Sequence, residues 1–141
     1  MELKFELSGI DAAAAAFLAF LKGNNTKVVA LTGAMGAGKT TFTAALLRAM
    51  GSRDIANSPT YSIINQYADP SGNSIYHMDL YRLRDEEEAI QAGIEDCLYS
   101  GNLCVVEWPE KAASILPEDT LFVHLQENED GNRILSSKTS Y

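Results

Sequence analysis

The stretch GAMGAGKT, residues 33–40, decides the fold because it fits the phosphate-loop pattern G-x-x-x-x-G-K-[ST]. It follows the apolar, β-branched run of residues 28–31, which is typical of a buried strand, and it precedes a helix predicted over Thr41–Met50. Strand, loop and helix in this order place backbone N–H groups around an anion at a helix N-terminus. We therefore predict that the loop binds the phosphates of a nucleoside triphosphate.

Two side chains of the loop have predicted roles of their own. Lys39 should bridge the β- and γ-phosphates, and the Thr40 hydroxyl should ligate Mg²⁺. The residues predicted to contact the nucleotide are Gly33, Ala34, Met35, Gly36, Ala37, Gly38, Lys39, Thr40 and Thr41.

Strand and helix patterns alternate on both sides of the loop. This alternation predicts an α/β fold of the P-loop NTPase type, with a partly parallel sheet, antiparallel strands at its hairpins and helices on both faces. No linker or repeat interrupts the pattern, so we expect a single domain over residues 1–141. The predicted strands are Leu3–Leu7, Val28–Leu31, Ser62–Tyr67, Ser74–Leu80, Leu103–Glu107, Leu121–Gln126 and Arg133–Ser137, and the predicted helices are Ala12–Leu21 with Ser8 as N-cap, Thr41–Met50 and Asp85–Ala92.

The charge balance argues against direct binding of nucleic acid. The chain has 19 acidic and 11 basic residues and a net charge of −8, and no cluster of Lys and Arg is visible. Any link to RNA should therefore run through a partner protein. The apolar segment Ala12–Leu21 has acidic flanks and is too short to span a bilayer, so we expect a cytoplasmic protein without a membrane anchor.

Two carboxylates follow predicted strands and could complete a site for nucleotide chemistry. Asp79 follows the residues 75–78, and Glu107 follows the apolar residues 103–106. The carboxyl ends of strands in an open α/β sheet face the ligand crevice, so each acid is a candidate for the metal or its water shell. Glu107 is the better metal candidate because its strand is more uniformly apolar. Thr60, in a Ser-Pro-Thr turn, could sense the γ-phosphate.

Other polar and aromatic residues give weaker signals. His77 and His124 lie inside strand patterns, and we interpret both as structural. Arg82 and Arg84 could stabilise transferred charge or pair with nearby acids on the surface. Trp108 could pack in the core or cover a ligand.

Four classes of nucleotide protein fit these observations to different degrees. A GTPase is disfavoured because the chain lacks an Asn-Lys-x-Asp segment. A small-metabolite kinase resembling shikimate kinase stays open, although the chain lacks its Arg-rich lid and its Asp-x-Asp pair. An ATPase that drives a partner, or a nucleotide sensor that does not hydrolyse its ligand, also fits.

Four segments together resemble one family. These are GAMGAGKTTF at 33–42, SPTY at 58–61, YHMDLYRL at 76–83 and VEWPE at 106–110. In this order and spacing they resemble TsaE, also called YjeE, the bacterial ATPase family of tRNA threonylcarbamoyladenosine (t6A) synthesis. The resemblance extends from about Val28 to Pro117.

The resemblance implies a function and a set of site residues. It implies an ATPase that uses ATP and Mg²⁺ and works with TsaB and TsaD, which bind the tRNA and transfer the threonylcarbamoyl group. Lys39 and Thr40 would bind phosphate and Mg²⁺, with Lys39 also part of the catalytic set. Glu107 would be the second magnesium ligand, and Thr60 and Asp79 would be the switch and catalytic residues.

Three positions qualify the resemblance. Family loops usually have Asp where this chain has Ala34, which puts tuning by a partner or the metal shell in question. The first helix usually offers a Thr where this chain has alanines from Ala12 onward. Arg133 matches an arginine common after the last turn, and we expect it to approach the nucleotide.

Overall fold

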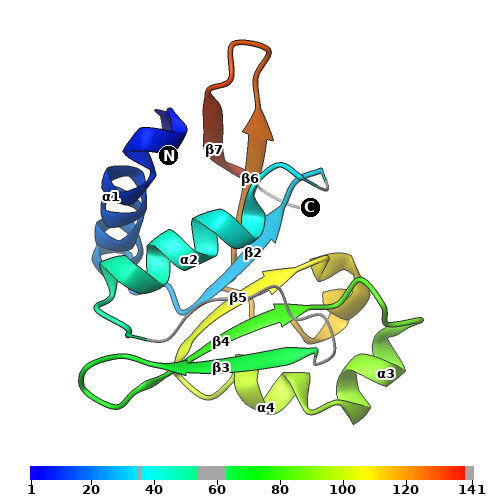
Figure 1. Ribbon diagram of the computed structural model, residues 1–141. Helices are drawn as coiled ribbons and strands as arrows, with labels where there is room; N and C mark the ends of the chain where they lie inside the picture. Colours follow the sequence, from blue (N-terminus) through cyan, green and yellow to red (C-terminus); the bar gives the residue numbers. More distant parts are fainter. Residues whose placement is uncertain (35, 54–62, 139–141) are drawn as a thin grey trace.

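Four parallel strands form the centre of a mixed seven-stranded sheet (Figure 1). The computed structural model describes residues 1–34, 36–53 and 63–138. The strand order is β1-β7-β6-β2-β5-β4-β3, in which β2, β4, β5 and β6 are mutually parallel and the outer pairs are antiparallel. The strands are β1 (Glu2–Phe5), β2 (Val28–Thr32), β3 (Ile64–Ala68), β4 (Ser74–Asp79), β5 (Leu103–Glu107), β6 (Leu121–Glu127) and β7 (Arg133–Lys138).

Helices cover both faces of the sheet, as predicted (Figure 1). One face, called the α2 face below, carries α1 (Ile10–Gly23) and α2 (Lys39–Ala49). The opposite face carries α3 (Glu86–Gln91), α4 (Ile94–Leu98) and the 3₁₀ segment η2 (Pro109–Ile115).

The two-residue period of the strands assigns each side chain to a face. On β5, Leu103 and Val105 pack on the α2 face, whereas Cys104 and Val106 join the opposite core. Glu107 continues the odd-numbered row, so its side chain lies on the α2 face, where the loop enters α2. The pattern of burial along β5 therefore positions an acid beside the phosphate loop.

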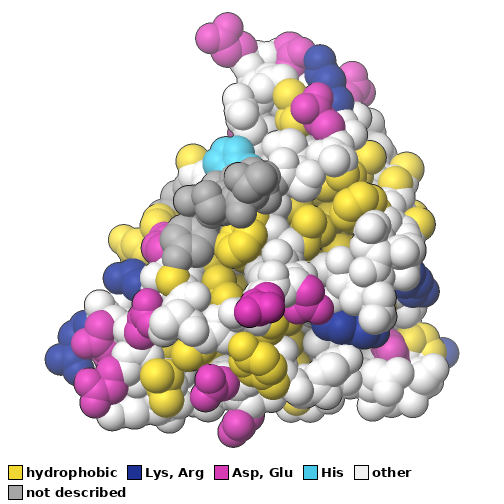
Figure 2. Space-filling view, turned by 180° about the vertical axis from the view of Figure 1, so that it is seen from behind, with side chains coloured by type: hydrophobic (Ala, Val, Ile, Leu, Met, Phe, Trp, Pro, Cys, Tyr) yellow, Lys and Arg dark blue, Asp and Glu magenta, His cyan; other side chains and the backbone are white. Residues whose placement is uncertain are grey.

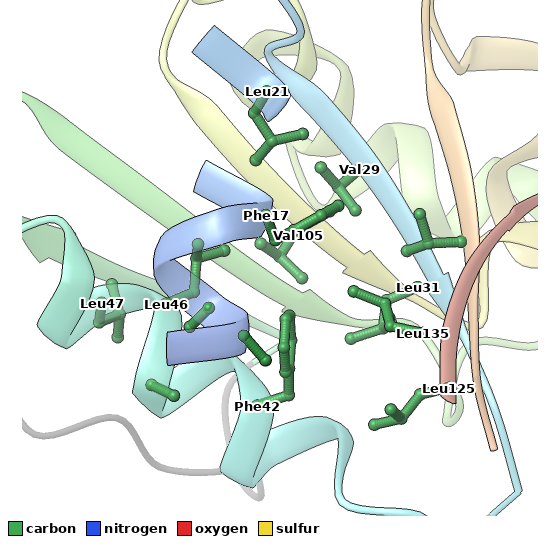
Figure 3. Packing of buried hydrophobic residues seen from close by; sticks show 14 of the residues in the cluster. Phe17, Leu21, Val29, Leu31, Phe42, Leu46, Leu47, Val105, Leu125 and Leu135 are labelled. Atoms are coloured by element: carbon green, nitrogen blue, oxygen red, sulfur yellow. The ribbon is translucent and has the colours of Figure 1, made fainter. Parts of the chain in front are cut away.

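Aromatic rings join the two helices of the α2 face to the sheet (Figure 3). The Phe42 ring of α2 lies 5.7 Å from Phe17 of α1 and 5.9 Å from Phe5 of β1, centroid to centroid. Phe17 and Phe42 are 1% and 2% exposed. Such aromatic pairs add about 0.5–1.5 kcal/mol each beyond their area burial, so they fix α2 firmly against the sheet.

The first helix differs from its prediction. Ser8 is not its N-cap, because residues Leu7–Gly9 form a separate 3₁₀ turn in which the Gly9 N–H donates to the Glu6 carbonyl at 2.9 Å. The helix then begins at Ile10 with Gly9 as N-cap. The third helix was predicted well: Asp85 caps α3 by accepting from the Glu88 N–H at 3.0 Å.

Two short elements were missed from the sequence. The helix α4 has five residues between Gly93, with φ of 82°, and Tyr99, and η2 begins at Pro109. Both are too short for the 3.6-residue period to show. Tertiary packing stabilises them, since Ile94, Leu98, Ala112 and Ile115 all enter the core opposite α2.

The surface agrees with the acidic composition. In the view from behind, acidic side chains lie near the top and across the lower half of this face, and no broad basic patch is visible on it (Figure 2). Within the described residues, no helix is long and apolar enough to cross a membrane.

Candidate nucleotide-binding site

The loop of residues 33–40 joins the end of β2 to the first turn of α2. Gly38 immediately precedes the helix with φ of 100°, a left-handed conformation that glycine adopts at no steric cost. The Phe42 N–H donates to the Gly38 carbonyl at 2.8 Å, and the Thr43 hydroxyl donates to the Lys39 carbonyl at 2.9 Å. The first amides of α2 have no intrahelical acceptor, so they are free to face an anion at the loop.

Gly33 begins the loop in contact with the neighbouring strand. A Cβ at this position would lie 2.6 Å from the Leu125 carbonyl oxygen of β6, which is part of the sheet backbone and cannot move away cheaply. The loop therefore follows the sheet edge more closely than any side chain would permit.

We expect Gly33→Ala to destabilise the protein by about 1–3 kcal/mol, because the new methyl group must displace backbone in a packed site. Thermal unfolding of the purified variant measures the effect. Gly23→Ala is the matched control: a Cβ there meets nothing within 4 Å, and alanine is the better helix former, so its stability should equal or exceed that of the wild type. Equal melting temperatures for the two variants would contradict the close contact.

Parallel strands bring the two predicted acids to the same edge of the sheet. Asp79 of β4 pairs in register with Glu107 of β5, and Glu107 in turn lies opposite Leu31, one residue before β2 ends. Odd-numbered residues of β4 and β5 share the α2 face, so both carboxylates lie on the side of the loop.

A cavity of about 370 Å³ lies where these elements meet. Its volume is within the range of small-molecule sites. It brings together the loop, the start of α2 and both acids. It is lined by Gly36, Gly38, Lys39, Thr40, Thr41, Asp79, Glu107 and Trp108.

Lys39 is the buried cation of this cavity. The side chain is 8% exposed; its Nζ donates to the Gly33 carbonyl at 2.8 Å and lies 3.8 Å from Glu107 Oε1. The ammonium group also lies 5.1 Å from the centroid of the Trp108 ring, within range of a cation–π interaction. These contacts hold the positive charge at the floor of the cavity, beside the helix N-terminus.

Trp108, directly after Glu107, has a strained backbone conformation. Its φ of 57° and ψ of 53° are left-handed, a conformation that costs a non-glycine residue about 1–3 kcal/mol. The ring packs against Tyr81, with centroids 4.9 Å apart and planes inclined by 46°. The left-handed backbone turns the chain sharply after Glu107 and brings the indole to the cavity, while the side chain also packs against the core opposite α2.

Comparison with known proteins identifies the family. The sequence model of the threonylcarbamoyl adenosine biosynthesis protein TsaE matches residues 7–135. The chain belongs to the TsaE family. It is 41% identical over 107 residues to the TsaE of Haemophilus influenzae, covering 76% of this chain and 67% of that protein. It is 38% identical over 129 residues to the TsaE of Rickettsia bellii, covering 91% and 87%.

A solved structure agrees with this assignment. The crystal structure of YdiB from Bacillus subtilis matches with a TM-score of 0.64 and 27% identity, covering 97% of this chain and 84% of that one. The relatives of the TsaE family carry names of tRNA threonylcarbamoyladenosine biosynthesis proteins.

The cavity of this TsaE chain fits a magnesium–phosphate ligand. Glycine backbone, helix N-terminus and Lys39 suit phosphate oxygens, while Thr40, Asp79 and Glu107 offer the hard oxygen ligands that Mg²⁺ prefers. The described residues contain no group of three or more His, Cys, Asp or Glu side chains arranged to hold a metal. Mg²⁺ in phosphate sites takes one or two carboxylates and completes its shell with phosphate oxygens and water.

Several residues predicted to contact nucleotide lie outside this cavity. Ala34 and Ala37 line a second cavity of about 200 Å³ on the β6 side of the loop, together with residues 124–127. Gly36 of the loop lines both cavities, so the loop lies between them. Met35 and Thr60 lie outside the described residues, and their predicted roles stay predictions.

Arg133 packs against the loop instead of lining the larger cavity. Its Nε lies 3.4 Å from the position that a Gly38 Cβ would occupy, and this buried nitrogen has no hydrogen-bond partner among the described residues. The guanidinium group contacts the Gly131 carbonyl at 3.5 Å and lies 4.0 Å from a Glu127 carboxylate oxygen. The predicted approach of Arg133 to the nucleotide stays a prediction.

The polar residues with weaker sequence signals lie in different parts of the structure. Arg84 pairs with Glu88 at 2.5 Å on the surface, and this hydrogen bond lowers the pKa of the Glu88 carboxyl. The ring Nδ1 of His124 lies 2.9 Å from the Thr32 hydroxyl. His77, which we interpreted as structural, is buried, and its ring contacts Glu107 in the site. The spacing was an available signal, since His77 precedes Asp79 by two residues on one strand and must share its face.

Proposed function

We propose that this member of the TsaE family is an Mg²⁺-dependent ATPase of tRNA t6A synthesis, acting with TsaB and TsaD and not as the transferase itself. The observation that carries the proposal is the convergence of Lys39, Asp79 and Glu107 on one cavity beside the phosphate loop. The family supplies the t6A context. This context supports a cytoplasmic location for the protein, where it would meet tRNA only through its partners.

Each side chain has a distinct task in the proposed hydrolysis. The loop amides and Lys39 bind the β- and γ-phosphates and stabilise the negative charge that shifts between them. Asp79 orients the attacking water and accepts its proton, while Thr40 and Glu107 hold Mg²⁺. When bound, Mg²⁺ supplies a positive charge that neutralises the phosphate oxygens. Trp108, which lines the cavity and packs against Tyr81, limits the access of water.

The acidic charge of this chain bears on which protein contacts the tRNA. A net charge of −8 and the scattered acids of Figure 2 disfavour direct contact with tRNA. The proposed role is therefore to reset a TsaB–TsaD complex that itself holds the RNA, and hydrolysis by the isolated protein should be slow.

Phosphate release from ATP by the purified protein, with and without TsaB and TsaD, tests this proposal. We expect hydrolysis to depend on Mg²⁺ and to rise when both partners are present. A folded trio without stimulation would contradict it. Phosphorylation of a small acceptor without partners would favour the kinase, and tight binding without any phosphate release would favour the sensor.

The variant Glu107→Gln tests the metal-binding part of the proposal. Loss of the carboxylate charge should weaken binding of Mg²⁺–ATP by about 1–3 kcal/mol, the range for a lost charge-assisted contact. Calorimetric titration measures this effect, with the exposed residue Glu95→Gln on α4 as control. Unchanged affinity in Glu107→Gln would remove this residue from the metal site.

A further inference from the structure

The side chain of His77 is fully enclosed behind the cavity. It is 1% exposed, comes from the middle of β4 and lies on the α2 face with Ile75 and Asp79. In the sheet, His77 pairs in register with Val105, two residues before Glu107 on the neighbouring strand. The imidazole can therefore reach diagonally toward the end of β5.

The contact between His77 and Glu107 is short and buried. His77 Nε2 lies 2.5 Å from Glu107 Oε2, and the Glu107 residue is 4% exposed. The other ring nitrogen, Nδ1, is buried without a hydrogen-bond partner among the described residues. A hydrogen on Nε2 satisfies the carboxylate and leaves no donor at Nδ1 unpaired, so this tautomer fits the surroundings best.

The two oxygens of Glu107 consequently face different groups. Oε2 is held by His77 behind the sheet edge, whereas Oε1 lies 3.8 Å from Lys39 Nζ and faces the loop. A carboxylate fixed by one oxygen cannot rotate freely about its side-chain torsions. The hydrogen bond from His77 therefore determines which oxygen Glu107 presents to the cavity.

We propose that His77 is a positioning residue that holds Oε2 of Glu107 so that Oε1 is presented to the metal of the bound nucleotide. This inference rests on the proposed function, since it assigns the metal to Glu107. Hydrogen bonds of this kind behind a metal ligand are usually worth about 10- to 100-fold in metal affinity or activity.

Two substitutions separate positioning from mere packing. In His77→Gln the side-chain amide nitrogen occupies the place of Nε2 and can still donate to Glu107. In His77→Asn the amide corresponds to Nδ1 and is too short to reach the carboxylate. The two side chains are otherwise chemically alike.

The decisive experiment is calorimetric titration of a non-hydrolysable ATP analogue into each variant, once in excess Mg²⁺ and once in EDTA. We expect His77→Asn to bind about tenfold more weakly than the wild type in Mg²⁺. In EDTA its affinity should equal that of the wild type, and His77→Gln should resemble the wild type in both buffers.

Other results would overturn the inference. A purely structural His77 predicts that His77→Asn loses affinity equally in Mg²⁺ and EDTA, or in neither. If His77→Asn does not fold, the titration of His77→Gln tests the inference alone. A His77→Gln variant that binds the analogue more weakly than the wild type only in Mg²⁺ would contradict the role of the Nε2 donor. A wild-type protein whose binding does not depend on Mg²⁺ would contradict the proposed function itself, which distinguishes the two failures.

Discussion

The variant Lys39→Met is expected to bind ATP roughly 10- to 100-fold more weakly than the wild type, the range for a lost hydrogen bond to a charged group. Methionine keeps an apolar stem of similar length against Trp108, so the fold should survive. What disappears is the buried ammonium group, which lies 3.8 Å from Glu107 and beside the phosphate loop.

Equilibrium titration with ATP measures this effect, and Lys22→Met on the exposed surface of α1 is the control. The control should bind ATP as the wild type does. If Lys39→Met also retained wild-type affinity, the cavity beside Lys39 could not be the phosphate site.

The variant Asp79→Asn should reduce turnover by about 100-fold or more, within the range for loss of a general base, while leaving ATP affinity nearly unchanged. Asp79 lines the cavity and accepts a hydrogen bond from the Tyr81 N–H at 3.1 Å through Oδ1. Asparagine keeps an oxygen that can accept this bond, so the turn after β4 should be preserved. Only the ability to take a proton from water is removed.

Single-turnover hydrolysis in the presence of the partner proteins separates the chemical step from binding. Asp96→Asn, on the exposed side of α4, serves as the control for loss of an acidic charge. Wild-type turnover in Asp79→Asn would exclude this residue from the mechanism. A large loss of ATP affinity instead would reassign it to binding.

Local signals in the sequence predicted the frame of the fold. The apolar strands and the loop GAMGAGKT have periods and turn residues that depend on their own neighbours, so the order of strands and helices was readable. The convergence of Asp79 and Glu107 also followed from a general rule, since carboxyl ends of parallel strands meet at one edge.

Contacts across strands could not be predicted in the same way. The bond between His77 and Glu107 depends on the register of β4 against β5, and registers are set by the whole sheet. Trp108, whose ring packs against Tyr81, likewise has a left-handed backbone that no turn residue in its own segment indicates. Short elements such as α4 were missed because five residues carry too little periodicity.

Ala34 lies in the phosphate loop but away from the proposed metal site. Ala34 lines the smaller cavity on the β6 side and not the cavity of Lys39 and Glu107. Its side chain is therefore separated from the proposed metal ligands by the loop itself. This separation supports the expectation that phosphate binding tolerates alanine, because backbone amides make that contact.

A crystal structure of the protein with Mg²⁺ and a non-hydrolysable ATP analogue tests the central claim most directly. We predict that the γ-phosphate lies within hydrogen-bond distance of Lys39 Nζ, at about 3 Å, and that the metal is bound by Thr40 and by Oε1 of Glu107. Asp79 should face the γ-phosphate from the far side of the cavity. Phosphates bound away from the loop, or a metal without contact to Thr40 and Glu107, would contradict the account.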